Sequence, residues 1–490
     1  MENVSQTQQC PYVAKCGACH IGEKSYEEEL AEKREYVVRH IGKYCSQIHD
    51  VAGMYYPYHY RNKVHAVFGK IKDEVVAGTY AEGTHTIIPV SGCFIEDTQA
   101  SAIIQTVTQL IKSFKLWVYN EDTGRGLMRH ILVRKGASTK QIMVVLVTAS
   151  AEFPHKNHFV AELRRRHSEI TTIVQNINDK QTTMVLGDRE KTLFGPGFIE
   201  DVLMGLRFRI SPSSFYQVNT AQTQVLYKKA IQAAALTGKE HVIDAYCGIG
   251  TIGMCMSAKA GRVTGIELNQ QAVKDAKANA KRNNIKNMRF IAADATEYMT
   301  QMSQNGERAD VIVMDPPRSG STEAFVRAAA SLKPSRIVYV SCEPETLGRD
   351  LAWFRREGYH AREAWPVDMF AFTECVETIV LLSHKSPDSV INVTVEFGEG
   401  EGKVPLDAIA ERAKKYLPKP KITYKMIQEY IEKKYGFKIH TAYIAEVKRS
   451  LGLTMYDAPN AVEELKHPRK RPSKEKVEAI TEALKYFEVI

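Results

Sequence analysis

The apolar positions of the chain change their spacing along its length, and each spacing predicts a different kind of element. Residues 26–44 place apolar positions at helical spacing among charge pairs, which indicates an amphipathic helix. Between about Tyr55 and Arg209, short β-branched runs separated by turn residues predict mostly strands. From residue 241 to residue 383, apolar runs alternate with helical stretches, and this alternation is typical of βαβ units around a parallel sheet.

The composition changes again after about Ser386. Amphipathic helices are expected at 424–436 and 441–452, with the spacing of a helix-turn-helix and basic residues on the second helix. The basic stretch HPRKRPSKEK, residues 467–476, precedes a last expected helix. We expect this part of the chain to dock RNA or, alternatively, to be a solvated helical appendage or a partner-binding domain.

The length of the chain requires several domains. At 490 residues it exceeds the roughly 250–300 residues at which a single core stops growing. The changes of pattern predict four parts: a segment with clustered cysteines that leads into a central domain, a β-rich central domain, an α/β domain and a helical appended domain. Their expected boundaries are 1–95, 96–210, 211–385 and 386–490.

Composition and charge narrow the class of protein only slightly. The net charge of +9 leans mildly toward anionic partners and is weak evidence for nucleic acid by itself. The chain has no apolar run of membrane-helix length and no signal-peptide core at its start, so we expect a cytoplasmic protein with no membrane partner. Nine cysteines in a reducing compartment indicate metal binding or catalysis rather than disulfides.

A nucleoside-binding site is predicted where the first strand of the α/β domain ends. DAYCGIGTIG, residues 244–253, places glycines between a strand and a helix, where backbone N–H groups can approach a ligand. Glu267 ends the second strand and can accept hydrogen bonds from ribose hydroxyls, and Asp294 ends the third and can accept one from an adenine amine. Asp315 stands at the tip of the fourth strand. The glycine spacing also fits a nicotinamide dehydrogenase, but DPPR and SCEP on the next two strands look like a class I S-adenosylmethionine-dependent methyltransferase.

Cys342 is the expected nucleophile of this domain. It lies between a strand and a helix N-terminus, which favours the thiolate, although burial as a small core residue is the usual fate of a free cysteine. A thiolate that adds to C6 of a pyrimidine makes C5 nucleophilic, and a base must then remove the C5 proton. Glu374 and Glu377 are candidates for this base, and Glu377 directly precedes an apolar strand.

The motifs FYQVN, DAYCGIG, DPPR, SCEPETLGRD and MF-x-x-T-x-x-VE resemble those of the RNA (uracil-C5)-methyltransferase family, from about Cys10 to Ser383. This family includes bacterial 23S rRNA and tRNA enzymes. The resemblance implies a Rossmann-like methyltransferase domain at 211–385 behind an RNA-facing central domain. It implies that Cys342 is the nucleophile and Glu377 the base. The residues that it places around S-adenosylmethionine and a flipped uracil are Gln217, Tyr246, Glu267, Asp294 and Asp315.

The chain departs from the family pattern at four positions and at its start. Glu343 stands where the family usually has Asn, and Ala371, Phe372 and Cys375 replace Pro and two His before the base. Many rRNA enzymes also carry a small β-barrel before the cysteines, and only nine residues precede Cys10 here.

The cysteine spacing C-x5-C-x2-C at Cys10, Cys16 and Cys19 predicts a metal site that needs a fourth ligand. Cys93 is the expected fourth ligand, with Cys45 and His20 as rivals, and spacing alone leaves zinc and iron–sulfur open. The resemblance implies a [4Fe–4S] cluster, of structural role, on Cys10, Cys16, Cys19 and Cys93. Family members with this cysteine spacing resemble the 23S rRNA enzymes, whereas the tRNA enzymes often lack it.

The resemblance therefore implies methylation of C5 of uracil in 23S rRNA, and we expect a monomer that binds no DNA. A tRNA uracil-C5 methyltransferase is the alternative, and a non-catalytic iron–sulfur RNA-binding protein is a further one. Residues 54–68, MYYPYHYRNKVHAVF, interleave aromatic and basic side chains, which suits both stacking on single-stranded RNA and an ordinary strand.

Overall fold

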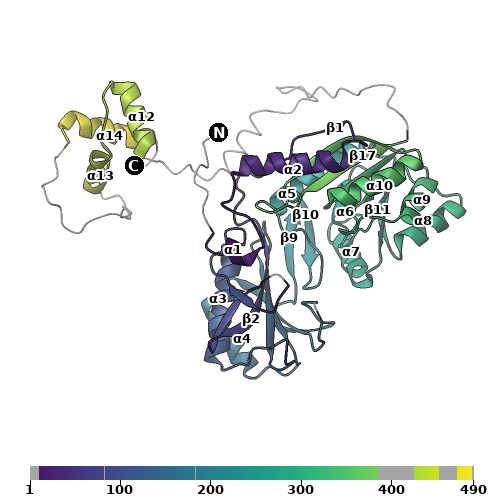
Figure 1. Cartoon of the computed structure of the whole chain (residues 1–490), viewed down its shortest axis with the longest axis horizontal. Helices are drawn as coiled ribbons and strands as arrows, with labels where there is room; N and C mark the ends of the chain where they lie inside the picture. Colours follow the sequence, from purple (N-terminus) through teal and green to yellow (C-terminus); the bar gives the residue numbers. More distant parts are fainter. Residues whose placement is uncertain (1–9, 82, 183, 385–423, 452–471, 488–490) are drawn as a thin grey trace. The chain divides into compact units, whose positions relative to one another are not determined.

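The structure is a computed structural model that describes residues 10–81, 83–182, 184–384, 424–451 and 472–487. The chain forms two compact units, Met1–Asp388 and Ser389–Ile490 (Figure 1).

The larger sheet of the first unit has eight strands in the order β1-β16-β17-β15-β14-β11-β12-β13. Strands β11 to β15 are parallel, and β17 is antiparallel to both of its neighbours. The strands after β1 are β11 (His241–Ala245), β12 (Arg262–Glu267), β13 (Met288–Ala292), β14 (Val311–Met314), β15 (Arg336–Ser341), β16 (His360–Val367) and β17 (Glu377–Ser383). The predicted α/β fold around a parallel-dominated sheet is thus confirmed.

Helices cover both faces of this sheet, which explains why its strands are nearly continuous apolar runs. Val242 and Val263 pack with helices α5, α6 and α7 on one face, and Ile243 and Ile266 pack with α8, α9 and α10 on the other. Side-chain caps begin α5, α7, α8 and α9 at Asn219, Asn269, Asp294 and Thr322. The helices are α5 (Thr220–Ala234), α6 (Thr251–Ser257), α7 (Gln270–Arg282), α8 (Ala295–Gln304), α9 (Glu323–Ser331) and α10 (Pro344–Arg356).

The central part of the chain forms a second sheet, in the order β4-β3-β2-β5-β6-β7-β8. Helices α3 (Thr98–Ser113) and α4 (Lys156–Arg166) pack against it, and the hairpin β9 (Ile199–Leu203) and β10 (Leu206–Ile210) follows it. The sheet strands are β2 (Lys63–Ile71), β3 (Glu74–Tyr80), β4 (Ile87–Pro89), β5 (Met128–Lys135), β6 (Ile142–Thr148), β7 (Ile170–Ile177) and β8 (Arg189–Phe194). The sequence pattern predicted mostly strands here and did not separate out the two helices.

Helix α2 (Tyr26–Ile41) and strand β1 (Gln47–Ile48) precede the central sheet in the chain but pack on the larger sheet. Helix α1 (Val13–Cys16) is followed by α2, which begins with a capping box formed by Ser25 and Glu28. Val37 and Ile41 of α2 belong to the same core as α10, and the two helices lie side by side (Figure 1). Strand β1 then pairs in parallel with β16. The chain enters the central sheet only at Lys63.

The second unit contains α12 (Tyr424–Tyr435), α13 (Thr441–Ser450) and α14 (Lys474–Tyr486). Ile427, Ile431, Ile444, Ile480 and Leu484 form its core. The predicted helix pair is therefore present, whereas the first half of the basic stretch, residues 467–471, lies outside the described residues. Among the helices that the structure describes, none is both long and apolar enough to cross a membrane.

Candidate active site

The glycine-rich turn after β11 is shaped by two carboxylates. Gly253 donates its N–H to Asp244 Oδ2 at 2.9 Å, and Gly248 donates to Glu267 Oε2 at 3.0 Å. Glu267 Oε1 also accepts from the N–H of Asn269 at 2.8 Å. Gly248 has φ +54° and Gly250 has φ +82°, so the turn uses left-handed conformations that favour glycine. Glu267 is thus held in place at the end of its strand, next to the turn.

Gly253→Ala is expected to lower the free energy of unfolding by about 1–3 kcal/mol, as overpacking does. A Cβ at Gly253 would stand 2.6 Å from Asp244 Oδ2, and Asp244 is buried. Urea unfolding of the two proteins measures the difference. Ala258→Ser, at the exposed end of the same helix, is the control and should change stability by less than about 0.5 kcal/mol. Equal stabilities of Gly253→Ala and the parent would contradict this close contact.

The other predicted cofactor residues lie at the same edge of the sheet. Asp294 is exposed and caps α8, accepting from the N–H groups of Thr296 and Glu297 through Oδ1. The ring of Tyr246 stacks on Phe325 with centroids 5.2 Å apart. Gln217 is buried just before α5. The strand ends therefore bring Tyr246, Glu267, Asp294 and Asp315 to one edge, as parallel strands require.

Cys342 and Glu377 are brought together by the antiparallel pairing of β15 with β17. The last residue pair of this ladder is Ser341 with Thr378, so the next position along each strand is Cys342 on one side and Glu377 on the other. Asp315 follows β14, the other neighbour of β15, and its charge acts on both residues. The structure thus places the two predicted catalytic residues opposite one another, although their roles stay predictions.

Burial and like charge control the protonation of this group. Burial raises the pKa of Asp315, and burial together with the charge of Asp315 raises the pKa of Glu377. Burial, Glu377 and Asp315 raise the pKa of the Cys342 thiol to about 12, with the Arg318 guanidinium acting in the opposite direction. The thiolate expected from the helix N-terminus is therefore wrong for the ligand-free protein, because burial beside two carboxyls outweighs the helix end.

A cavity of about 660 Å³ opens in front of Cys342. It is lined by Arg318, Cys342 and Cys375 on the sheet side and by side chains of α2. Tyr36 of α2 donates its hydroxyl to Glu343 Oε1 at 2.9 Å, and Arg318 Nη2 donates to Cys375 Sγ at 3.2 Å. The two departures from the family pattern at Glu343 and Cys375 thus each have a polar partner at the cavity wall.

The segment that leads to Glu377 is held by a buried ionic network. Lys33 Nζ lies 2.6 Å from both Glu29 Oε1 and Asp368 Oδ1, and it also donates to the carbonyl of Phe370 at 3.1 Å. Phe372 has φ +63°; its N–H donates to Glu29 Oε1 at 2.7 Å, and its carbonyl accepts from the N–H of His20 at 2.8 Å. The cysteine-containing segment and α2 therefore fix the backbone just before Glu377.

Sequence reasoning missed the residues of this network. Glu29 and Lys33 are four residues apart on a helix and read as one of several surface charge pairs, yet both are almost fully buried. No local signal identifies them, because their partner Asp368 is far away in the sequence. Arg318 was visible in DPPR, but the motif by itself does not show that its charge acts on Cys342 and Glu377.

The four predicted cluster ligands are half-buried and close in space. Cys10, Cys19 and Cys93 pack around Ile21 and Phe372. The charges of Cys10 and Cys16 raise the pKa of Cys19, after burial as the main cause, and Cys19 contributes to the raised pKa of Cys93. This set of four soft sulfur donors fits an iron–sulfur cluster chemically. Within the described ranges, however, no three His, Cys, Asp or Glu side chains are arranged to hold a metal ion.

The two rival ligands point elsewhere. Cys45 is buried in the core between α2 and the larger sheet, and burial raises the pKa of its thiol to about 11. The ring of His20 faces Glu29, with Nε2 at 3.7 Å from Glu29 Oε2. Cys93 therefore stays the predicted fourth ligand.

Known proteins resemble this chain over most of its length. A sequence model of the tRNA (uracil-5-)-methyltransferase family matches residues 187–385. An uncharacterized RNA methyltransferase of Listeria innocua is 42% identical over 379 residues, which cover 77% of this chain and 83% of the relative. One of Clostridium acetobutylicum is 43% identical over 379 residues, covering 76% and 82%.

A solved structure with the same fold is the Pyrococcus abyssi tRNA (uracil-54, C5)-methyltransferase in complex with S-adenosyl-L-homocysteine. It matches with a TM-score of 0.62 and 26% identity, over 73% of this chain and 83% of that one. The sequence relatives, the family match and the arrangement of the strand ends agree with one another. The chain belongs to the RNA (uracil-C5)-methyltransferase family.

Proposed function

We propose that the protein transfers a methyl group from S-adenosylmethionine to C5 of a uracil in 23S rRNA. The observation that carries this reaction is the placement of Cys342 opposite Glu377 at the end of the β15–β17 ladder, beside Asp315. The turn at 246–250 with Glu267 supports the cofactor site, because ordered N–H groups and a fixed carboxylate suit a nucleoside. The bound cofactor supplies an electrophilic methyl group.

In this mechanism Cys342 and Glu377 act in turn on the uracil ring. The Cys342 thiol gives its proton to solvent in the cavity and its sulfur forms a bond to C6. The electron pair of the C5–C6 double bond then moves to C5, which takes the methyl group. Glu377 then accepts the C5 proton, the C5–C6 double bond re-forms and the sulfur–C6 bond breaks. Arg318 favours the ionised forms of both residues.

The rate of methyl transfer in a single turnover is expected to rise with pH between about 6 and 9. Both reacting groups must be deprotonated, and both have raised pKa values, so lowering the pH through those values removes the active form. Rates at saturating cofactor and RNA measure this profile. A rate that is constant or that falls with rising pH would contradict the assigned roles.

The rRNA substrate is favoured by the cysteine set, which we propose holds a [4Fe–4S] cluster of structural role on Cys10, Cys16, Cys19 and Cys93. Purification without oxygen, followed by iron, sulfide and zinc analysis, tests the cluster. Zinc without sulfide at one ion per chain would refute it, and Cys16→Ser should lose iron and the visible absorbance.

A tRNA uracil is the second candidate substrate, because the Pyrococcus abyssi neighbour is described as a tRNA enzyme. Mass spectrometry of 5-methyluridine in rRNA and tRNA, from cells with and without the gene, separates the two. Loss of 5-methyluridine at a 23S position supports the rRNA proposal, and loss only in tRNA overturns it.

A further inference from the structure

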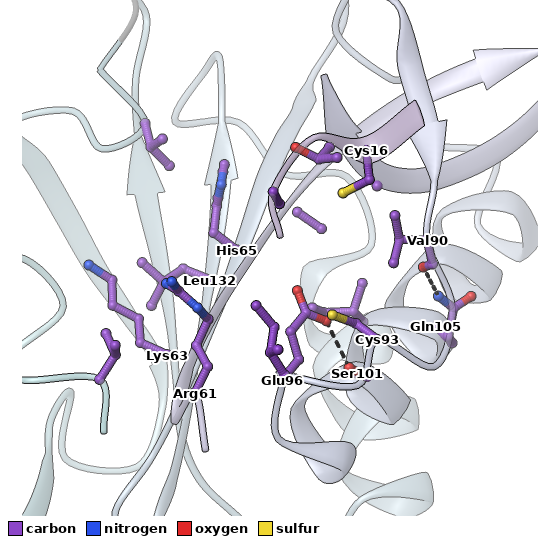
Figure 2. Close-up of a pocket in the computed structure, with 18 of the residues that line it drawn as sticks. Cys16, Arg61, Lys63, His65, Val90, Cys93, Glu96, Ser101, Gln105 and Leu132 are labelled. Atoms are coloured by element: carbon purple, nitrogen blue, oxygen red, sulfur yellow. Dashed lines mark hydrogen bonds between the residues drawn. The ribbon is translucent and has the colours of Figure 1, made fainter. Parts of the chain in front are cut away.

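A second cavity, of about 500 Å³, lies between the cysteine-containing segment and the central sheet. Figure 2 shows Arg61, Lys63 and His65 on the sheet side, with Cys16 and Cys93 on the other side. Lys63 and His65 are two residues apart on β2, so they share one face of the strand. We call the site around Arg61, Lys63 and His65 the cationic pocket.

The cations of the cationic pocket, Arg61 and Lys63, are not engaged in ion pairs within the part of the chain that the structure describes. Burial raises the pKa of the nearby Glu96 carboxyl, however, and the charge of Arg61 acts on this carboxyl in the opposite direction. Glu96, the acidic side chain in the lining, accepts a hydrogen bond from Ser101 Oγ at 3.0 Å. Burial and the charges of Arg134 and Arg61 lower the pKa of Lys63 to about 8. His65 is exposed on this face of β2, and its Nε2 lies at hydrogen-bond distance, 3.3 Å, from His130 Nδ1.

Behind the pocket, a third cation is buried and incompletely paired. Arg134 of β5 stands opposite Lys63 in the strand register and is 1% exposed. Its Nη1 donates to the carbonyl of Ser214 at 2.9 Å, while Nε and Nη2 have no hydrogen-bond partner. Burying a guanidinium without a counter-charge costs free energy. An anion held by Arg61 and Lys63 in front of Arg134 would offset part of that cost.

The cationic pocket adjoins the candidate active site. Val218 lines the pocket and directly follows the predicted cofactor residue Gln217. Asn62, the neighbour of Arg61 in the chain, donates its N–H to the carbonyl of Val218 at 2.8 Å. The Arg61 guanidinium lies over the ring of Phe370 at 5.8 Å, and Phe370 begins the segment that leads to Glu377. A strand of RNA whose base reaches Cys342 needs a place for its flanking phosphates on this side.

We propose that the cationic pocket binds a backbone phosphate of the RNA substrate next to the target uracil, with Arg61 and Lys63 as its charged contacts. The choice of RNA as the occupant rests on the function proposed above. Phosphate contacts of this kind set the position of a strand without reading its sequence.

The test is the salt dependence of RNA binding, measured by fluorescence anisotropy on a labelled uridine-rich single-stranded oligonucleotide without cofactor. Arg61→Gln and Lys63→Gln should each reduce the slope of log affinity against log salt concentration by about 0.7, and the double variant by about 1.4. Lys63→Arg should keep the parental slope. Lys259→Gln, an exposed lysine on another part of the unit, is the matched control.

Thermal melting and calorimetric titration with S-adenosylmethionine check that the variants are folded. A folded double variant with the parental slope would overturn the cationic pocket as a phosphate site, whether or not the enzyme makes 5-methyluridine. The expected change of slope in a protein that makes no 5-methyluridine would instead leave the pocket standing and refute the proposed function.

Discussion

Glu377→Gln is expected to accumulate a covalent complex with RNA that survives denaturing electrophoresis. Cys342 can still add to C6, and C5 can still be methylated. The amide that replaces the carboxylate cannot take the C5 proton, so the sulfur–C6 bond does not break. Turnover should fall about 1000-fold, within the range known for removing a general base. Gel shift of labelled RNA and 5-methyluridine formation measure the two effects.

Two variants separate the roles in this experiment. Cys342→Ala should form neither the adduct nor the product, because it lacks the sulfur. Glu374→Gln, an exposed carboxylate in the same segment, should turn over within about tenfold of the parent. If Glu374→Gln trapped the adduct and Glu377→Gln did not, the two carboxylates would have to exchange roles. Methylation by Cys342→Ala would refute the covalent mechanism.

Lys33→Met should destabilise the first unit by about 3–5 kcal/mol, as the loss of one partner from a buried ion pair does. The change leaves Glu29 and Asp368 buried without their shared cation, with side chains 2% and 0% exposed. It also removes one hydrogen bond from the carbonyl of Phe370, which still accepts from the N–H and the hydroxyl of Thr373. Denaturant unfolding of the chain, followed by a probe in the first unit, measures the loss.

The matched control is Lys24→Met, which removes the exposed ion pair with Glu32 and should cost no more than about 1 kcal/mol. A loss below about 1 kcal/mol for Lys33→Met as well would show that the network does not stabilise the fold. Because Glu29 also binds the N–H of Phe372, the variant should lower the methyl-transfer rate at saturating RNA more than it weakens RNA binding.

The sequence identified the candidate site residues that directly follow the end of a strand. Asp315 and Cys342 each follow an apolar run, and parallel strands bring such ends to one edge. The face-to-face position of Cys342 and Glu377 was not predictable in the same way. It depends on β17 entering between β15 and β16, and no periodicity in the chain specifies that order.

Other features were missed because they depend on tertiary contacts. The charge pair of Glu29 and Lys33 looks like solvated helix surface until Asp368 approaches it. Helix α3 did carry a local signal, since Asp97 caps it and Ile103, Ile104 and Val107 recur at helical spacing, but it was absorbed into a region interpreted as strands. The protonation of Cys342 could not be inferred either, because it depends on burial and on two carboxyls that are far from Cys342 in the sequence.

The pairing of β1 with β16 has a consequence for how the protein is made. Gln47 leaves the ribosome early, but its partner Glu363 is among the last residues of the first unit to be synthesised. Val37 and Ile41 of α2 likewise stay unburied until the core residues of the later strands and of α10 have been synthesised. Such contacts of long sequence separation slow folding and leave apolar surface open to aggregation. The backbone before Glu377 therefore takes its final position only after synthesis of nearly the whole unit, so a nascent chain stalled before β16 holds no assembled candidate site.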